Sequence, residues 1–345
     1  KCVSAGRGGS DTGGNQYAVD GILTTAMNII FNLILLLGFK MGNIGYLLSV
    51  ILADICSIAF LTIMAKLWRY VIFTGISKDM VKSMMSFCLP MIPTAVMWWI
   101  INSSGSFFVS EFIGFEASGI YKAAFKFPSM ISIFSGIFSQ AWNMSAITEN
   151  NSKTIASFYT NVFNIFQSFV YVLAAGLMLV IRPAILIFCE PEFEIAFRYT
   201  PFLILSVSFT CFSTFMGSVY VASKKSVRSM VTAAIGAGVN VLLNIVLIQT
   251  MELHGAAIAA FASFLIIFII RAADTKRIVR MDLKLPKMIF NSVLLLAMSA
   301  VIIFVEDITV YYAALAVLFL LVTAINFRSG LRAVNIILKK EKIER

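Results

Sequence analysis

Ten apolar stretches constrain this chain more than any other feature of its sequence. They fall near residues 21–39, 43–64, 86–108, 117–141, 155–181, 201–222, 229–248, 255–270, 288–305 and 310–327. About twenty apolar residues in a helix cross the roughly 30 Å hydrocarbon layer of a bilayer. Lipid offers no hydrogen-bonding partner to the backbone, so such stretches predict helices. We therefore expect an all-α polytopic membrane protein with about ten transmembrane helices.

Composition argues against other classes of protein. Hydrophobic residues make up 60% of the chain and charged residues 13%, which is more apolar than a soluble domain. One His and five Cys without a C-x-x-C pair provide no ligand set for zinc, so we expect no metal and no cofactor. No connection between spans is long enough for a nucleic-acid-binding or catalytic domain. We therefore expect no nucleic-acid partner, and we expect that the protein is not an enzyme.

The basic residues predict the orientation of the chain in the membrane. Of the 27 Lys and Arg residues, 22 lie in the two ends and the even-numbered connections, and three lie on the opposite side. Cytoplasmic loops carry the excess of Lys and Arg. Both ends of this chain are therefore expected in the cytoplasm of a bacterial cell, with the protein in the inner membrane.

An internal repeat relates the first span to the seventh. Asn28 and Asn32 correspond to Asn240 and Asn244 at a constant offset of 212 residues. Paired Asn side chains among small residues allow close helix packing and hydrogen bonds between helices, so we assign these four residues to packing. Six spans separate the copies, so both run in one direction. This pattern indicates a parallel repeat of six-helix units.

The repeat also predicts how the chain is organised. Four spans precede the Asn-containing helix of the second copy and none precede the first, so we expect a piece of a fourteen-helix protein that does not transport by itself. The expected parts are a cytoplasmic Gly-rich segment (1–20), the last two helices of an N-terminal lobe (21–64), a basic linker (65–85), a complete six-helix lobe (86–270), a basic loop (271–287), two terminal helices (288–327) and a basic tail (328–345).

Two cations lie inside the fourth span. Lys122 and Lys126 are one helical turn apart, and Lys126 lies about 14 Å below the outer surface at a rise of 1.5 Å per residue. Lys122 can extend its ammonium group to the outer headgroups. A cation at the depth of Lys126 suits an anionic substrate, with a structural ion pair as the alternative. Pro128 favours a bend in the helix beside this site.

The third span combines prolines with aromatic residues. Pro90 and Pro93 predict a bend in its cytoplasmic half, and with Pro128 they are candidate hinges. Trp98 and Trp99 lie deeper than an interfacial aromatic belt, so they could stack on sugar rings, although packed or lipid-facing Trp is equally compatible. Asn102 follows one turn later and is grouped with them as a candidate substrate residue.

Two further charged residues are candidates for function. Asp54 lies in the middle of the second span, where we expect a buried carboxylate that favours its protonated form and could couple transport to an ion gradient. The competing interpretations are a hydrogen-bonded packing residue and a partner for a cation in the expected missing helices. Arg198, at the outer end of the sixth span, is a candidate cation for the substrate entrance or for lipid headgroups.

Seven short motifs carry a resemblance to a known family. They read GFKMG at 38–42, GYLLS at 45–49, LPMIP at 89–93, WWIIN at 98–102, GIY at 119–121, KFP at 126–128 and QAW at 140–142. With them the chain resembles the bacterial oligosaccharide (O-antigen) flippases over most of residues 17–270. That family belongs to the superfamily of multidrug and polysaccharide exporters, which implies a fold of two helical lobes.

The resemblance implies a function and a set of partners. Flippases of this family move undecaprenyl-diphosphate-linked oligosaccharides to the outer leaflet by alternating access, and a polysaccharide polymerase and a chain-length regulator are possible partners. Lys126 matches the Lys that precedes Pro in the family. Two departures are that Ser104, Gly105 and Ser106 stand where the family commonly has Ser-Asp-Arg, and that Lys122 replaces a small residue.

Three other functions stay open from the sequence. A multidrug antiporter of the same superfamily would favour acids over the cations Lys122 and Lys126 in its cavity. A lipid II-type flippase differs from an oligosaccharide flippase only in the family motifs. A polysaccharide polymerase or ligase would also be polytopic and basic, but it would need a larger outer loop than residues 182–200 provide.

Overall fold

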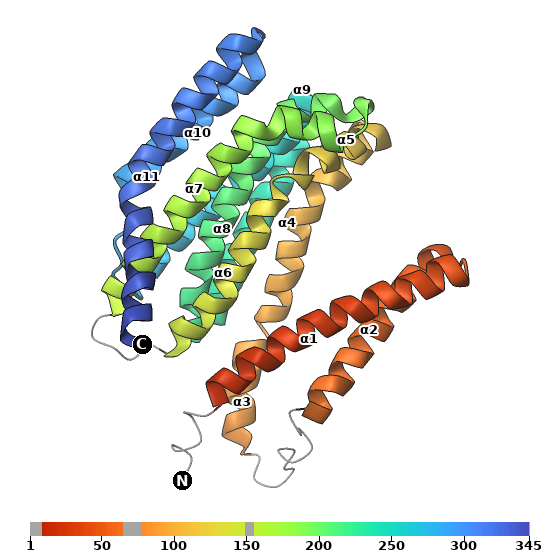
Figure 1. Ribbon diagram of the computed structural model, residues 1–345, viewed down its shortest axis with the longest axis vertical. Helices are drawn as coiled ribbons and strands as arrows, with labels where there is room; N and C mark the ends of the chain where they lie inside the picture. The colour runs from red at the N-terminus through yellow and green to blue at the C-terminus, as the bar shows by residue number, and fades with distance from the viewer. Residues whose placement is uncertain (1–8, 65–76, 149–154, 345) are drawn as a thin grey trace. The chain divides into compact units, whose positions relative to one another are not determined.

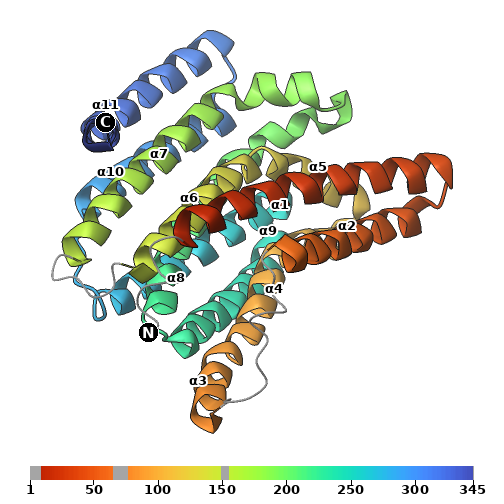
Figure 2. The same cartoon turned by 60° about the horizontal axis from the view of Figure 1, so that its bottom comes forward.

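The computed structural model describes residues 9–64, 77–148 and 155–344, and these ranges are helical without a strand (Figures 1 and 2). Parts of the predicted Gly-rich segment and basic linker therefore lie outside the described residues. The chain divides into unit 1, Lys1–Val81, and unit 2, Lys82–Arg345.

Unit 1 is an antiparallel pair of helices. Helix α1, Gly9–Asn32, continues into a wider helical turn, η1, Leu33–Gly38, and α2 covers Gly42–Met64. The hydroxyl of Ser49 on α2 donates to Oδ1 of Asn32 at 2.8 Å, and Asn32 Nδ2 donates to Asn28 Oδ1 at 2.5 Å. The Asn pair of the first repeat therefore joins the two helices of its own unit.

Unit 2 is a helical bundle that begins within α3. Its elements are α3 Lys78–Cys88, which the division between the units crosses, α4 Met91–Phe112, α5 Phe115–Lys126, α6 Ser129–Thr148, α7 Ile155–Phe188, η3 Pro191–Arg198, α8 Thr200–Ala222, α9 Ser226–Thr275, α10 Leu285–Phe304 and α11 Ile308–Glu344. Most of α8 is buried, and α9, α7, α6 and α10 pack around it.

Fewer helices than predicted spans are long enough to cross a bilayer. Among the described residues, eight helices are long and apolar enough to do so. Two of the ten predicted spans share the 50-residue helix α9, which has non-helical backbone angles at Glu252. Another, 117–141, is divided into α5 and α6 at Phe127 and Pro128. The predicted all-α membrane fold is confirmed. The number is lower because α9 counts as one helix although it holds two predicted spans, and because neither α5 nor α6 is among the eight.

Aromatic residues fill the centre of unit 2. The ring of Phe215 on α8 lies 4.8 Å from Trp142 and 5.1 Å from Phe163, and Trp142 Nε1 donates to the hydroxyl of Ser218 at 2.7 Å. This packing leaves Trp142 only 4% exposed. The end of α6 is thereby fixed against α8.

The Asn pair of the second repeat also joins helices. Asn240 Nδ2 donates to the hydroxyl of Ser263 at 3.2 Å, and Asn244 Nδ2 donates to Asn240 Oδ1 at 3.0 Å. A third helix takes part, because the hydroxyl of Ser104 on α4 donates to the same Asn240 oxygen. Asn240 therefore links α4 to both halves of α9.

Candidate functional site

A groove between α4 and α5 gathers most of the polar side chains of these two helices. Helix α4 ends at Phe112, and Gly114, with φ of 132°, turns the chain directly into α5. Residues other than glycine rarely adopt that angle. The tight connection places the end of α4 beside the start of α5, and their facing surfaces become the two walls of the groove.

Serines and one lysine dominate the lining. The groove has a volume of about 520 Å³, within the range of ligand sites in proteins. Its polar lining residues are Asn102, Ser103, Ser106 and Ser110 from α4 and Ser118, Tyr121 and Lys122 from α5, with Phe107, Phe115 and Phe125 between them. Hydroxyl, amide and ammonium groups beside aromatic rings are suited to a ligand that carries both sugar hydroxyls and negative charge.

Short polar contacts join the two walls. The hydroxyl oxygens of Ser106 and Ser118 lie 3.0 Å apart, and Ser118 Oγ also donates to the carbonyl of Ser106 at 3.1 Å. Between them, Gly105 leaves room for a ring from α5, because a Cβ atom there would lie 2.6 Å from the Tyr121 hydroxyl oxygen.

These contacts give a structural reason for one departure from the family pattern. Ser104 bonds to Asn240, Gly105 accommodates Tyr121, and Ser106 contacts Ser118. An Asp and an Arg at positions 105 and 106 would not fit this packing unchanged.

Lys122 is the cation of the groove. Its side chain is exposed, and in the described part of the chain the one ion pair joins Arg228 to Asp274. Lys122 thus has no carboxylate partner among the described residues. An ammonium group beside hydroxyl groups can attract an anionic oxygen and hydrogen-bond to it.

Of the other predicted substrate residues on α4, one lines this groove and two do not. Asn102 lines it, and its Nδ2 donates to the carbonyl of Trp98 at 2.7 Å. Trp98 stacks against Phe264 at 5.9 Å, whereas Trp99 is 68% exposed. Substrate contact by either Trp stays a prediction.

Lys126 and Arg198 lie outside the lining. Lys126 is the last residue of α5, it is exposed, and it likewise has no carboxylate partner among the described residues. Arg198 ends η3 with its guanidinium 5.9 Å from the ring of Phe197. Their roles in substrate binding stay predictions.

The predicted hinge prolines lie at or near helix breaks. α3 ends just before Leu89 and Pro90, and α5 ends just before Phe127 and Pro128. Pro93 instead lies in the first turn of α4, where a missing N–H removes no helical hydrogen bond. Bending at these positions stays a prediction.

Asp54 differs from the expectation. Its side chain is exposed on α2, so unit 1 does not bury this carboxylate. In contrast Asp20, which the sequence reasoning did not single out, accepts a hydrogen bond from the Ser57 hydroxyl at 2.7 Å. An ion-coupling role for Asp54 stays a prediction.

Arg271 is a residue that the sequence reasoning misplaced. The sequence put it in the basic loop 271–287, but α9 continues to Thr275 and buries Arg271 to 2% exposure. Its Nη1 donates to the carbonyl of Ser213 at 2.9 Å and its Nε to Thr232 Oγ1 at 3.0 Å. The guanidinium also lies 5.3 Å from the ring of Trp98.

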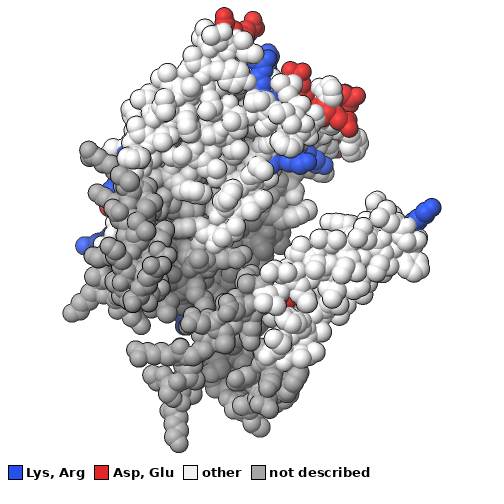
Figure 3. Space-filling view, in the orientation of Figure 1, with Lys and Arg blue, Asp and Glu red and all other residues white. Residues whose placement is uncertain are grey.

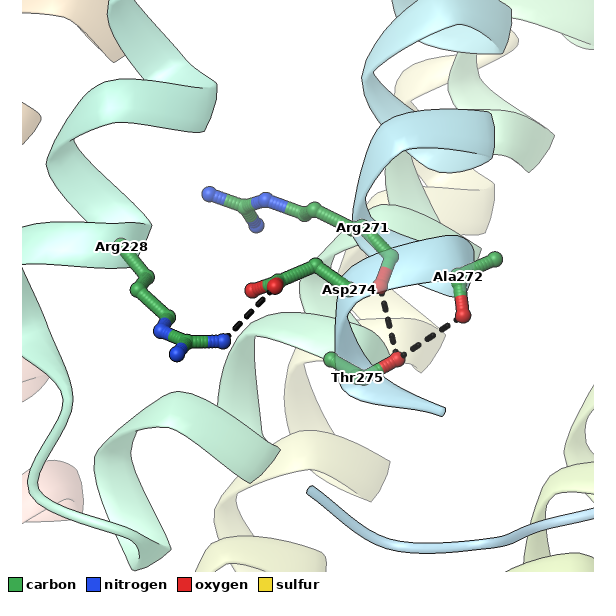
Figure 4. A network of polar contacts seen from close by, with 5 residues as sticks. All are labelled: Arg228, Arg271, Ala272, Asp274 and Thr275. Carbon is green, nitrogen blue, oxygen red and sulfur yellow. Dashed lines mark hydrogen bonds and ion pairs between the residues drawn. The ribbon is translucent and has the colours of Figure 1, made fainter. Parts of the chain in front are cut away.

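The ion pair next to Arg271 does not include it. Figure 4 shows the Asp274 carboxylate paired with Arg228, at 2.7 Å, rather than with Arg271. Polar groups and an aromatic face therefore surround the buried guanidinium, and no acid among the described residues neutralises it. Arg271 therefore connects α9 to α8 through the Ser213 carbonyl and to α4 through the ring of Trp98.

No metal site occurs in the described ranges, where no three or more His, Cys, Asp or Glu residues lie close enough to hold an ion.

Comparisons with known proteins agree with the architecture. A family model described as polysaccharide biosynthesis protein matches residues 19–194. The chain is similar to a structure titled lipid II flippase MurJ in an inward closed conformation, with a TM-score of 0.58 and 17% identity over 92% of this chain and 68% of that one. It is also similar to a MATE structure in the straight conformation, with a TM-score of 0.56 and 14% identity.

The likeness to these two structures establishes the fold alone, because the identities are 17% and 14%. The match to the MATE structure covers 75% of this chain but 62% of that protein, so this chain spans less than two thirds of its length. No curated protein sequence matches the chain.

Proposed function

This chain belongs to the polysaccharide biosynthesis protein family, and we propose that the complete protein translocates undecaprenyl-diphosphate-linked oligosaccharides from the cytoplasmic to the outer leaflet of the bacterial inner membrane. Alternating access between two lobes and coupling to an ion gradient are part of this proposal. The transported ligand combines a diphosphate with sugar hydroxyls, and it requires a site that offers a cation together with hydroxyl and amide groups.

The groove between α4 and α5 is the observation that carries the proposal. Lys122 supplies the cation, and Asn102 with Ser103, Ser106 and Ser110 supplies hydrogen-bonding groups on the opposite wall. The aromatic rings of Phe107 and Phe115 offer apolar faces for sugar rings. A multidrug antiporter has no comparable need for a cation beside a row of hydroxyls, and a lipid II-type flippase remains the alternative with the same chemistry.

The proposed orientation places both ends of this chain in the cytoplasm. Figure 3 shows acidic side chains gathered at one end of unit 2, over the turn from α10 to α11 and near η3. The basic connection from α8 to α9 lies at the end of α8 away from η3. The basic connection from α9 to α10 lies at the end of α10 away from the turn to α11. Such an asymmetry agrees with the excess of cations that cytoplasmic loops carry.

Genetic replacement tests the function. Deleting the gene in its host should abolish the surface polysaccharide and leave the lipid-linked oligosaccharide in the inner leaflet, and the complete wild-type protein should restore both. Accumulation of lipid II with an unchanged surface polysaccharide would instead favour the lipid II-type alternative. A polymerase or chain-length regulator that assembles with the protein should co-purify with it after cross-linking in the same host.

A further inference from the structure

A second groove runs along unit 2 between α9 and α10. Its volume is about 990 Å³, and it shares no lining residue with the groove between α4 and α5. On α9 the lining residues recur from Phe261 to Lys276, and on α10 from Leu285 to Leu296, at the spacing of one helical face. The second groove therefore runs between one face of α9 and one face of α10.

The second groove has a rigid aromatic floor and an exposed apolar rim. The ring of Phe209 lies 5.7 Å from both Phe261 and Phe268, and Phe209 and Phe268 are almost fully buried. At the rim, Ile289 is 62% and Val293 is 54% exposed. In a membrane such a surface faces lipid chains rather than water.

The length of the second groove matches one leaflet of a bilayer. The stretch from Leu285 to Leu296 on α10 rises about 16 Å at 1.5 Å per residue. Half of a hydrocarbon layer of roughly 30 Å is about 15 Å. A phospholipid acyl chain fits this length, whereas a polyprenyl chain as long as undecaprenyl would extend well beyond it.

Cations mark one end of the second groove. Lys276 and Arg280 are both exposed, and neither has a carboxylate partner among the described residues. The only acid among the lining residues, Asp282, accepts a hydrogen bond from the backbone N–H of Lys284 at 3.0 Å. Basic pockets between transmembrane helices at the cytoplasmic face bind anionic headgroups.

We propose that the second groove binds an anionic phospholipid of the cytoplasmic leaflet. Its phosphate contacts Lys276 and Arg280, and an acyl chain lies over the rings of Phe209, Phe261 and Phe268. The inference rests on the proposed orientation and not on which substrate is transported. Besides its charged mouth, the lining offers one polar side chain, Ser292, so it lacks the hydroxyl-rich wall that an oligosaccharide would need.

Lipid retention by the purified protein tests this site. The protein is reconstituted with a photoactivatable phosphatidylglycerol, irradiated and digested, and the labelled peptides are identified by mass spectrometry. Label is expected between residues 261 and 296. Neutralising both cations, Lys276→Gln with Arg280→Gln, should lower labelling about 25-fold, since each cation near a charged headgroup contributes about a fivefold factor.

Matched variants separate the site from general effects of charge and folding. The control Lys225→Gln with Arg277→Gln removes two exposed cations that do not line the second groove and should label like wild type. Ala273→Trp should block labelling by filling the groove, whereas Ala234→Trp, exposed elsewhere on α9, should not. Retained helical circular dichroism and monodisperse elution establish folding for each variant.

Three results would overturn the proposal. One is equal labelling of wild type and of the neutralised variant. Another is equal labelling by photoactivatable phosphatidylcholine, which has no net charge. The third is displacement of the label by undecaprenyl phosphate but not by unlabelled phosphatidylglycerol, because the carrier lipid would then be the occupant. None of these outcomes depends on transport activity, so failure here leaves the proposed function standing.

Discussion

Ser106 on α4 and Ser118 on α5 place their hydroxyl oxygens 3.0 Å apart and so join the two walls of the groove that contains Lys122. The contact is possible because Gly105, next to Ser106, lets the Tyr121 ring approach α4. Lys122 follows Tyr121 directly, so the packing that fixes this ring also sets the position of the cation. The shape of the groove therefore depends on a residue without a side chain.

Substituting Gly105 tests this packing. In Gly105→Ala the new methyl group would lie 2.6 Å from the Tyr121 hydroxyl oxygen, so α4 and α5 must separate, at a cost of about 1–3 kcal/mol in the free energy of unfolding. Thermal unfolding in detergent measures the loss, and Tyr121→Phe should restore part of it. Gly238→Ala is the control, because a methyl group there meets nothing within 4 Å. Equal stability of both Ala variants would contradict the packing.

Arg271 is expected to hold α9 against α8 and α4. Arg271→Lys keeps the charge, but one ammonium group cannot reach both the Ser213 carbonyl and the Thr232 hydroxyl, so we expect a loss of about 1–3 kcal/mol. The emission of Trp98 should also shift, since the guanidinium lies 5.3 Å from its ring. Arg277 is exposed, so Arg277→Lys should change neither the free energy of unfolding nor the emission of Trp98. Unaltered stability and emission in Arg271→Lys would show that these contacts contribute nothing.

Helical spans and cations inside them were predictable because lipid enforces simple rules on sequence. A continuous apolar stretch must be a helix, and a lysine such as Lys122 in that stretch stands out against it. The polar stripe of Ser103, Ser106 and Ser110 could also have been recognised, since it recurs at helical spacing and continues the face of Asn102. Serine is common in packed membrane helices, so its spacing alone does not distinguish a groove lining from packing.

Other features depend on contacts that spacing does not reveal. Arg271 lies at the end of an apolar stretch, where the sequence favours a loop, and it is buried only because groups on α8 and the first half of α9 accept its hydrogen bonds. For Asp54, mid-span position likewise does not show what surrounds the carboxylate, since the middle of a span need not be buried by its own unit. The groove itself requires the turn at Gly114 and the close approach at Gly105, and both are properties of tertiary structure.

Asn240 is expected to stabilise the fold through its hydrogen bond to Ser263. A double-mutant cycle of Asn240→Ala and Ser263→Ala should give a coupling energy of about 0.6–1.7 kcal/mol, from the average to the maximum for hydrogen bonds between membrane helices. Chemical unfolding in mixed micelles provides the four free energies. Asn161→Ala, at an exposed position of α7, should not couple to Ser263→Ala. A coupling energy near zero for the first pair would show that the hydrogen bond between Asn240 and Ser263 contributes nothing to stability.

Lys126 provides a separate test of the deep cation. In the complete protein, Lys126→Ala should abolish restoration of the surface polysaccharide at normal expression, and Lys126→Arg should retain part of it because the charge is preserved. Polysaccharide chain length on gels is the measurement, and immunoblotting controls for expression. If Lys126→Ala restores normal polysaccharide, Lys126 does not contact the substrate, and the cation of Lys122 would have to act alone.

The rate at which the purified complete protein translocates an undecaprenyl-diphosphate-linked oligosaccharide in proteoliposomes tests the central claim most directly. Lys122→Gln should lower that rate about tenfold or more, since a charge-assisted hydrogen bond contributes about 1.5–3 kcal/mol. Lys122→Arg should recover much of the rate, and Lys225→Gln, outside the groove, should transport like wild type. An unchanged rate in Lys122→Gln would contradict the assignment of the groove between α4 and α5 as the path of the anionic lipid.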